Sequence, residues 1–155
     1  QQEELKVKED IFNILVKESD VMPPESIIER ELKFMIEGTK FQIAQSGMKI
    51  EDSGFEPEKA EKEWREKAIF NTKGYMALES IAQVENIHIT QQDMEAEYEL
   101  LAEQTKQKVE DIQKRIMSNP DSLNQTTTKL LGQKTMTFIY SNCEFEYYKE
   151  EPKKD

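Results

Sequence analysis

Residues 21–48 read VMPPESIIERELKFMIEGTKFQIAQSGM, and this stretch decides the fold. Its apolar residues fall into two helical stripes, although a single stripe is enough to pack a helix against a protein core. The first stripe comprises Ile28, Leu32, Met35, Ile36 and Ile43. The second repeats every seventh residue, lies roughly 100° or more around the helix axis, and comprises Ile27, Phe34, Phe41 and Met48. The sequence therefore predicts one face that packs inside the protein and one that needs a partner.

Prolines and glycines divide the rest of the chain into about five predicted helices. A helix over residues 3–19 ends before Pro23 and Pro24, because a proline disfavours helical geometry in the residue that precedes it. The second helix covers residues 24–45 and ends at a Ser-Gly pair. A third helix is predicted to begin near Pro57 and to reach Val84 or Glu85, since its apolar residues keep one helical face.

The second half of the chain predicts two more helices with recognisable starts. Thr90, with Asp93 three residues later, resembles a capping box in which Asp replaces the usual Glu. The fourth helix is predicted to be continuous because one stripe contains Met94, Tyr98, Leu101, Val109, Ile112 and Ile116. Asn119 can cap the fifth helix, with Pro120 at its first position. Residues 143–147 then alternate as in a strand, and the charged residues 149–155 are expected to be disordered.

Composition and charge limit the classes of partner. Charged residues make up 34% of the 155 residues, and the chain is rich in helix formers such as Glu, Lys, Gln, Leu and Ala, so long amphipathic helices are expected. The formal net charge of −11 predicts that the protein repels nucleic acid and anionic membranes. No apolar run reaches the roughly 20 residues that cross a bilayer, and the first residues lack the apolar part of a signal peptide. The single Cys143 cannot form an internal disulfide. We therefore expect a cytoplasmic protein.

Residue patterns typical of catalysis or metal binding are missing. The 5 glycines are scattered, so no phosphate-binding loop is predicted. Glu85 and His88 have the spacing of a di-metal carboxylate bundle, but such sites need a second pair, and His88 is the single histidine. Cys143 has no neighbouring base to activate it. We expect no catalytic residue, no metal and no cofactor.

The order of the helices resembles the C-terminal domain of bacterial trigger factor, the ribosome-associated chaperone. The residues that carry the resemblance span nearly the whole chain: Asp20–Ile28 (DVMPPESII), residues 61–68 (EKEWREKA), Leu78–Ala82 (LESIA), residues 85–93 (ENIHITQQD), Leu130, Leu131, Lys134, Cys143 and the charged tail. The resemblance implies an elongated all-α bundle with two projecting helical arms. Residues 1–148 would form this chaperone domain, with helix one over 3–19, a first arm over 24–89 and a second arm over 90–140.

The same resemblance sets expectations for partners. Unfolded or nascent polypeptides would be held transiently on the inner surfaces of the arms. The ribosome-docking domain and the peptidyl-prolyl isomerase domain of the family have no counterpart in this sequence, so the chain itself is expected not to be an enzyme. The ribosome would be contacted only through that absent domain, and body surface left bare would allow a homodimer.

Seven apolar residues are the predicted peptide-binding residues: Ile27, Phe34, Met35, Phe41, Met48, Ile69 and Met76. Several belong to the 7 methionines of the chain, and methionine is the adaptable residue of promiscuous binding surfaces. Methionines that only fill gaps between helices would also fit the pattern. The seven-residue repeat would equally suit a coiled-coil contact to helix one or to another subunit.

Two other functions remain open at this point. A similar helical core occurs in the periplasmic chaperone SurA, although neither an export signal nor a parvulin-type isomerase stretch is seen here. The chain could instead be a non-enzymatic helical adaptor or structural arm whose second stripe binds one fixed partner.

Overall fold

The computed structural model describes residues 2–144. This part of the chain contains seven α-helices, one short 3₁₀-helix and no strand: α1 (Gln2–Glu18), α2 (Glu25–Gln45), η1 (Ile50–Asp52), α3 (Pro57–Glu63), α4 (Arg65–Val84), α5 (Gln91–Thr105), α6 (Val109–Met117) and α7 (Pro120–Asn142). The predicted all-α class is confirmed. The predicted tail over 149–155, and the predicted strand-like alternation beyond residue 144, lie outside the described residues.

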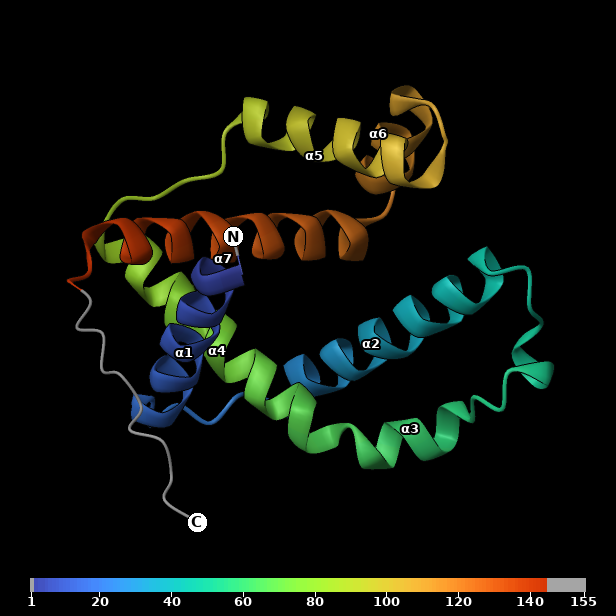
Figure 1. Cartoon of the computed structure of the whole chain (residues 1–155), viewed down its shortest axis with the longest axis horizontal. Helices are drawn as coiled ribbons and strands as arrows, with labels where there is room; N and C mark the ends of the chain where they lie inside the picture. The colour runs from blue at the N-terminus through green and yellow to red at the C-terminus, as the bar shows by residue number, and fades with distance from the viewer. Residues whose placement is uncertain (1, 145–155) are drawn as a thin grey trace, which may run out of the picture.

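Helix α4 lies at the centre of the molecule and contacts α1, α2 and α7 (Figure 1). The N-terminal half of α4 packs against α2, and its C-terminal half packs against α7. Helix α1 crosses α4 at Gly74, where the ring of Phe12 occupies the space that a side chain would fill. Phe12 also packs edge-on against Phe70 and Tyr75, with ring centroids 5.7 and 6.0 Å away. Helix α4 is therefore the element on which the others are assembled.

Two helical limbs extend from this centre toward the right of Figure 1, one above the other. Helices α2 and α3, joined through η1, form the first limb, and the α5–α6 hairpin beside α7 forms the second. The chain exposes 12040 Å², whereas a compact monomer of 18.2 kDa would expose about 8100 Å². Residues outside 2–144 can contribute at most about 2200 Å² to the exposed area. This is less than the difference between the exposed area of the chain and that of a compact monomer. The fold is elongated, and much of each helix has only one packed side.

A small apolar cluster packs α2 of the first limb against α4. Ile28 and Leu32 are each 3% exposed, and Ala68 of α4 is fully buried against them. Polar contacts follow on either side of the cluster. The Arg65 guanidinium donates to the Glu25 carboxylate at 2.5 Å, and Asn71 Nδ2 donates to a Glu31 carboxylate oxygen at 2.9 Å. These contacts fix which face of α2 is turned toward α4.

The predicted third helix is interrupted at Trp64, so the prediction of one continuous helix over 57–84 was wrong. Trp64 has φ −92° and ψ 0°, which ends α3 and precedes α4. Its ring packs against the α2–α4 cluster and lies 5.7 Å from the ring of Phe55. The helix breaks here because the Trp64 ring makes a tertiary contact. The local sequence therefore has no Gly or Pro that would mark the break. The bend places α3 alongside α2.

The predicted fourth helix is interrupted as well, and this prediction was also wrong. Helix α5 ends at Lys106, which adopts a left-handed conformation with φ 54° and ψ 34°. The chain then reverses, so that Ile112 and Ile116 of α6 pack against Tyr98 and Ala102 of α5. The residues of the predicted stripe do pack together, but across a hairpin. A 3.6-residue pattern cannot distinguish these arrangements because both halves keep the same period.

Two predicted helix starts are confirmed. Thr90 and Asp93 form a complete capping box at the start of α5, with the Thr90 N–H donating to Asp93 Oδ2 at 2.7 Å and the Asp93 N–H donating to Thr90 Oγ1 at 3.2 Å. Asn119 caps α7, where its Oδ1 accepts from the N–H of Asp121 and of Ser122. Local polar chemistry alone determines these starts, which is why the sequence predicts them.

The left-handed Lys106 gives a test of the α5–α6 hairpin. A Lys106→Gly variant should raise the free energy of unfolding by about 1 kcal/mol, because glycine adopts φ > 0 without the cost of a Cβ. Urea unfolding followed by circular dichroism measures the change. Lys114→Gly, inside α6, is the matched control and should lose about 1 kcal/mol. A loss of stability in both variants would mean that residue 106 is helical.

Candidate functional site

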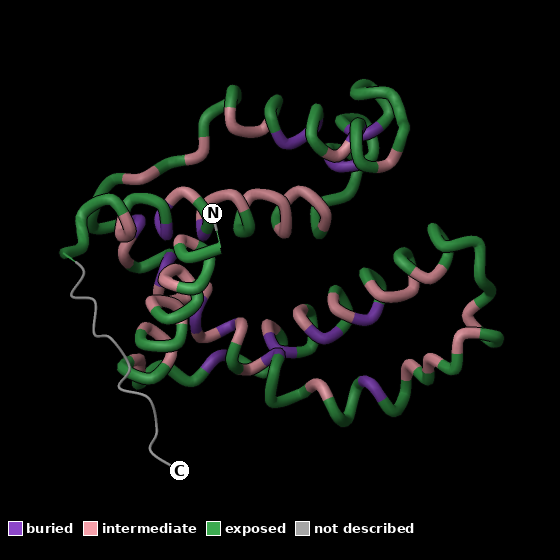
Figure 2. The backbone as a smooth tube through the Cα atoms, in the orientation of Figure 1, coloured by how far each residue is buried: buried purple, intermediate pink, exposed green. Residues whose placement is uncertain are grey.

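The face of α2 that points away from α4 is apolar and exposed. Ile28, Leu32 and Ile36 are the buried residues of α2, and Phe34 and Phe41 lie about 180° around the helix from them at 100° per residue. Both rings are 47% exposed. Figure 2 shows the buried residues of α2 on the side toward α3 and α4, whereas the opposite edge is exposed. The helix therefore carries two aromatic side chains with no partner in its own limb.

The seven predicted peptide-binding residues occupy three kinds of position. Phe34, Phe41 and Met48 are exposed, whereas Ile27 and Met76 are half-buried. Met35 and Ile69 are half-buried and pack against the cluster of Ile28, Leu32 and Ala68, so they form its edge. Met48 lies beyond the end of α2, after Gly47 with φ +77°. The seven-residue stripe is helical only over Ile27, Phe34 and Phe41.

Charged side chains follow one flank of this stripe. Arg30, Lys33 and Lys40 lie on the same side of the Phe34–Phe41 line at 100° per residue. Lys40 Nζ is 2.8 Å from the Glu37 carboxylate, whereas neither Arg30 nor Lys33 has an ion pair within residues 2–144. The Glu31 carboxylate on the other flank accepts the hydrogen bond from Asn71. At 100° per residue Glu37 lies between Arg30 and Lys33 on the same flank, so the exposed apolar line is bordered by charges of both signs.

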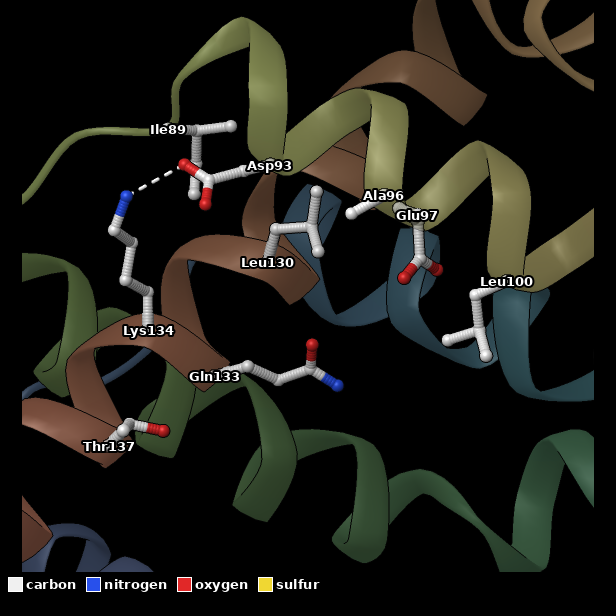
Figure 3. A pocket seen from close by; sticks show the side chains of 9 residues that line it. All are labelled: Ile89, Asp93, Ala96, Glu97, Leu100, Leu130, Gln133, Lys134 and Thr137. Atoms are coloured by element: carbon white, nitrogen blue, oxygen red, sulfur yellow. Dashed lines mark hydrogen bonds and ion pairs between the residues drawn. The ribbon is translucent and has the colours of Figure 1, made fainter.

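A cleft of about 380 Å³ lies between α5 and α7 in the second limb (Figure 3). Its apolar lining is Ile89, Ala96, Leu100 and Leu130. Sequence reasoning missed this site because Leu100 falls off the main stripe of α5, and because only the fold brings it near Leu130. The exposure of Leu100, which is 45% exposed, is the structural signal.

Two ion pairs join α5 to α7 across this cleft. Lys134 Nζ lies 2.7 Å from Asp93 Oδ2 (Figure 3). The same ammonium group donates to the His88 carbonyl at 3.0 Å. Lys129 Nζ lies 2.7 Å from a carboxylate oxygen of Glu97, whose side chain is only 5% exposed. Hydrogen bonds from Lys134, from the Thr90 backbone and from the Thr90 hydroxyl lower the pKa of Asp93 to about 2. The carboxylate of Asp93 is therefore held ionised.

Residues 2–144 contain neither a metal-binding cluster nor a membrane-spanning helix. No group of three His, Cys, Asp or Glu side chains in this range is placed to hold a metal ion. None of its helices is long and apolar enough to span a bilayer. The arrangement offers apolar surface, one cleft and fixed ion pairs, and this chemistry suits the binding of side chains.

Comparison with known families identifies the family to which this chain belongs. The family model described as the C-terminus of bacterial trigger factor protein matches residues 1–141. The chain belongs to this family. The trigger factor of Geobacter sp. (strain M21) is 24% identical over 133 residues, which cover 86% of this chain and 31% of that protein. The trigger factor of Koribacter versatilis (strain Ellin345) is 29% identical over 135 residues, which cover 86% and 31%.

A solved structure of trigger factor domains from Thermotoga maritima has the same fold. The TM-score is 0.60 at 17% identity, and the match covers 91% of this chain and 83% of that chain. At this identity the likeness concerns the fold alone. The chain spans about a third of the length of the curated trigger factors it matches. It is therefore similar to the C-terminal part of trigger factor.

The pKa of Asp93 predicts how the second limb responds to acid. Because this pKa lies below the usual 3.8, the contacts of Asp93 stabilise the fold above about pH 4 and are lost as the pH falls toward 2. The Asp93→Asn variant lacks these carboxylate contacts at every pH. The difference in free energy of unfolding between wild type and variant should be constant above about pH 5 and shrink between pH 4 and 2.

Urea unfolding at several pH values measures this difference. Glu103→Gln is the matched control, since Glu103 is an exposed carboxylate of the same helix. Its difference from wild type should be small and flat over the same range. An Asp93→Asn difference that stays unchanged down to pH 2 would contradict the proposed role of the Lys134 and Thr90 contacts.

Proposed function

We propose that this chain is a chaperone domain that transiently binds exposed apolar segments of unfolded or nascent polypeptides. The observation that carries the proposal is the second face of α2, where Phe34 and Phe41 are exposed opposite the packed face. Membership of the trigger factor C-terminus family supports it. The predicted arms, residues 24–89 and 90–140, would surround a client, with the two limbs as their projecting parts, and the cytosol would be the compartment.

The proposed surface comprises the seven predicted residues with different weights. Phe34, Phe41 and Met48 offer the most area to a client, and the half-buried Ile27 extends this stripe of α2. Met76 is half-buried on α4 and would contact a client apart from the stripe. Met35 and Ile69 support the surface from below because they also pack on the α2–α4 cluster. The α5–α7 cleft, with Leu100 exposed at its mouth, adds a second place for an apolar side chain.

The available area favours weak and reversible capture. Covering the exposed halves of Phe34, Phe41 and Met48 removes about 300 Å² of apolar surface from water. At about 25 cal/mol per Å² this contributes about 7 kcal/mol. Association costs from about 4 to 15 kcal/mol in lost freedom of motion. A single client segment is therefore held briefly and released by dissociation.

A longer parent protein, of the length of the relatives, would have activities that we do not assign to this chain. Their matched part is about a third of their length, so ribosome docking and prolyl isomerisation would belong to other parts of such a parent. We attribute neither activity to this chain. Its own role would be binding without catalysis or cofactor.

A double substitution on α2 tests the proposal. The chain should slow the aggregation of several unrelated denatured proteins, measured by light scattering. Phe34→Ser with Phe41→Ser should at least halve this protection and leave helicity unchanged, because both rings lie opposite the packed face. Val84→Ser with Met117→Ser is the matched control, since these residues are 77% and 59% exposed at other places. Their loss should have little effect.

Three results would contradict the proposal or its assignment of faces. Protection of a single partner protein only, with no effect on diverse clients, would favour the fixed-partner adaptor. Unfolding of the Phe34→Ser, Phe41→Ser variant would place these rings in the core. Equal loss of protection in the Val84→Ser, Met117→Ser variant would mean that any exposed apolar residue binds clients, wherever it lies on the protein.

A further inference from the structure

The cleft between α5 and α7 combines apolar walls with one buried acceptor. Leu100 is 45% exposed at its mouth, Leu130 lies on the facing helix, and Glu97 lines the same cleft with a side chain that is only 5% exposed. We propose that this cleft binds a tyrosine side chain of a client segment, with the ring between the two leucines and the hydroxyl donating to Glu97. This inference rests on the proposed function and deepens it, because it names a side chain that the second limb selects.

The two walls of the cleft are facing sides of α5 and α7. The residues that form them are Asp93, Ala96, Glu97 and Leu100 on α5, and Leu130, Gln133, Lys134 and Thr137 on α7. Each set has the i, i+3, i+4, i+7 spacing of one helical face. The volume of about 380 Å³ lies within the roughly 300–1,000 Å³ of clefts that hold small ligands. Because two helices build the cleft, it exists before a client binds, which lowers the cost of binding.

Glu97 has one oxygen atom that can still accept a hydrogen bond. Lys129 Nζ donates to its Oε1 at 2.7 Å, whereas Oε2 accepts no hydrogen bond within residues 2–144. Figure 3 shows the carboxylate pointing from α5 into the space between the two helices. A wholly apolar side chain in the cleft would remove water from this oxygen without replacing the hydrogen bond, which costs free energy. A side chain with a donor at its tip avoids this cost.

The balance of charge around the cleft favours a neutral donor over a cation. The carboxylates of Asp93 and Glu97 are paired with the ammonium groups of Lys134 and Lys129, at 2.7 Å in each pair. A lysine or arginine of the client would add an unbalanced fifth charge and would lose its own hydration. Glu103 is exposed and does not line the cleft, so solvent and salt screen its charge. The tyrosine hydroxyl supplies a donor without a charge.

The order of groups from the mouth to the interior favours tyrosine over other neutral donors. Leu100 is exposed and Glu97 is buried, so an entering side chain meets apolar surface first and the acceptor last. Tyrosine has the same order, because its hydroxyl lies at the far end of an apolar ring. The indole N–H of tryptophan lies on the side of its ring system. Serine and threonine are too short to reach past the leucine side chains.

Four labelled peptides of equal length test the proposal against the full chain. They differ only at the central position, where Tyr, Phe, Trp or Lys stands between flanking leucines. Fluorescence anisotropy gives the Kd of each peptide. The tyrosine peptide should bind about three- to tenfold more tightly than the phenylalanine peptide, since the two differ by one hydrogen bond to a carboxylate. It should also bind more tightly than the tryptophan and lysine peptides.

Variants of the cleft locate the preference. Glu97→Leu should bring the ratio of the phenylalanine Kd to the tyrosine Kd to about one, because the acceptor is removed. The ratio compares two peptides on one variant, so a change in general affinity affects both. Glu95→Leu, an exposed carboxylate of α5 outside the cleft, is the matched control and should leave the ratio unchanged. Leu100→Ser, at an exposed position, should weaken the tyrosine peptide about fivefold and tests the cleft if Glu97→Leu does not fold.

Failure of the tyrosine site and failure of the proposed function give different results. Equal Kd values for the tyrosine and phenylalanine peptides, or a tyrosine preference that persists in Glu97→Leu, would overturn the site. A lysine or tryptophan peptide that binds as tightly as the tyrosine peptide would overturn the choice of tyrosine. In each case the chaperone role stands if the chain still slows the aggregation of denatured clients. Absence of binding by all four peptides would overturn the site, and together with no protection of denatured clients it would overturn the proposed function itself.

Discussion

The packing of α2 against α4 through one face alone is the constraint on which the rest of the structure depends. Ala68 is small enough for the two helices to approach closely, and Ile28 and Leu32 cover it completely. No further layer lies over α2 within its limb. The second apolar stripe of α2 is therefore exposed because of how the limb is built, and no local unfolding is needed to present it.

The second limb is held by a different kind of interaction. Helices α5 and α6 share a small apolar cluster, whereas α5 meets α7 largely through the pairs Asp93–Lys134 and Glu97–Lys129. In the Glu97–Lys129 pair the carboxylate is buried and the lysine is half-exposed, so removing Lys129 would leave a buried charge without its partner, which is costly. These pairs therefore define where the hairpin sits, and the cleft remains between helices that apolar packing does not close.

The parts of the fold that local chemistry determines could be predicted from the sequence. Pro23, Pro24, Thr90 and Asn119 mark helix ends through their own backbone or side-chain preferences, and the two faces of α2 follow from periodicity. The breaks at Trp64 and Lys106 could not be predicted, because neither residue is a typical helix breaker. Their conformations depend on packing with Phe55 and between α5 and α6. The cleft at Leu100 was missed for the same reason.

Stability and binding are located on separate faces of α2, and this separation has a physical consequence. A surface that must hold varied segments changes its side chains at little cost to the fold only if those side chains do not pack on the core. Phe34 and Phe41 are half-exposed and lie outside the core clusters, whereas Met35 and Ile69 pack against the cluster of Ile28, Leu32 and Ala68. The binding preference of the limb can therefore be altered at the exposed stripe, while Ile28, Leu32 and Ala68 keep the helix in place.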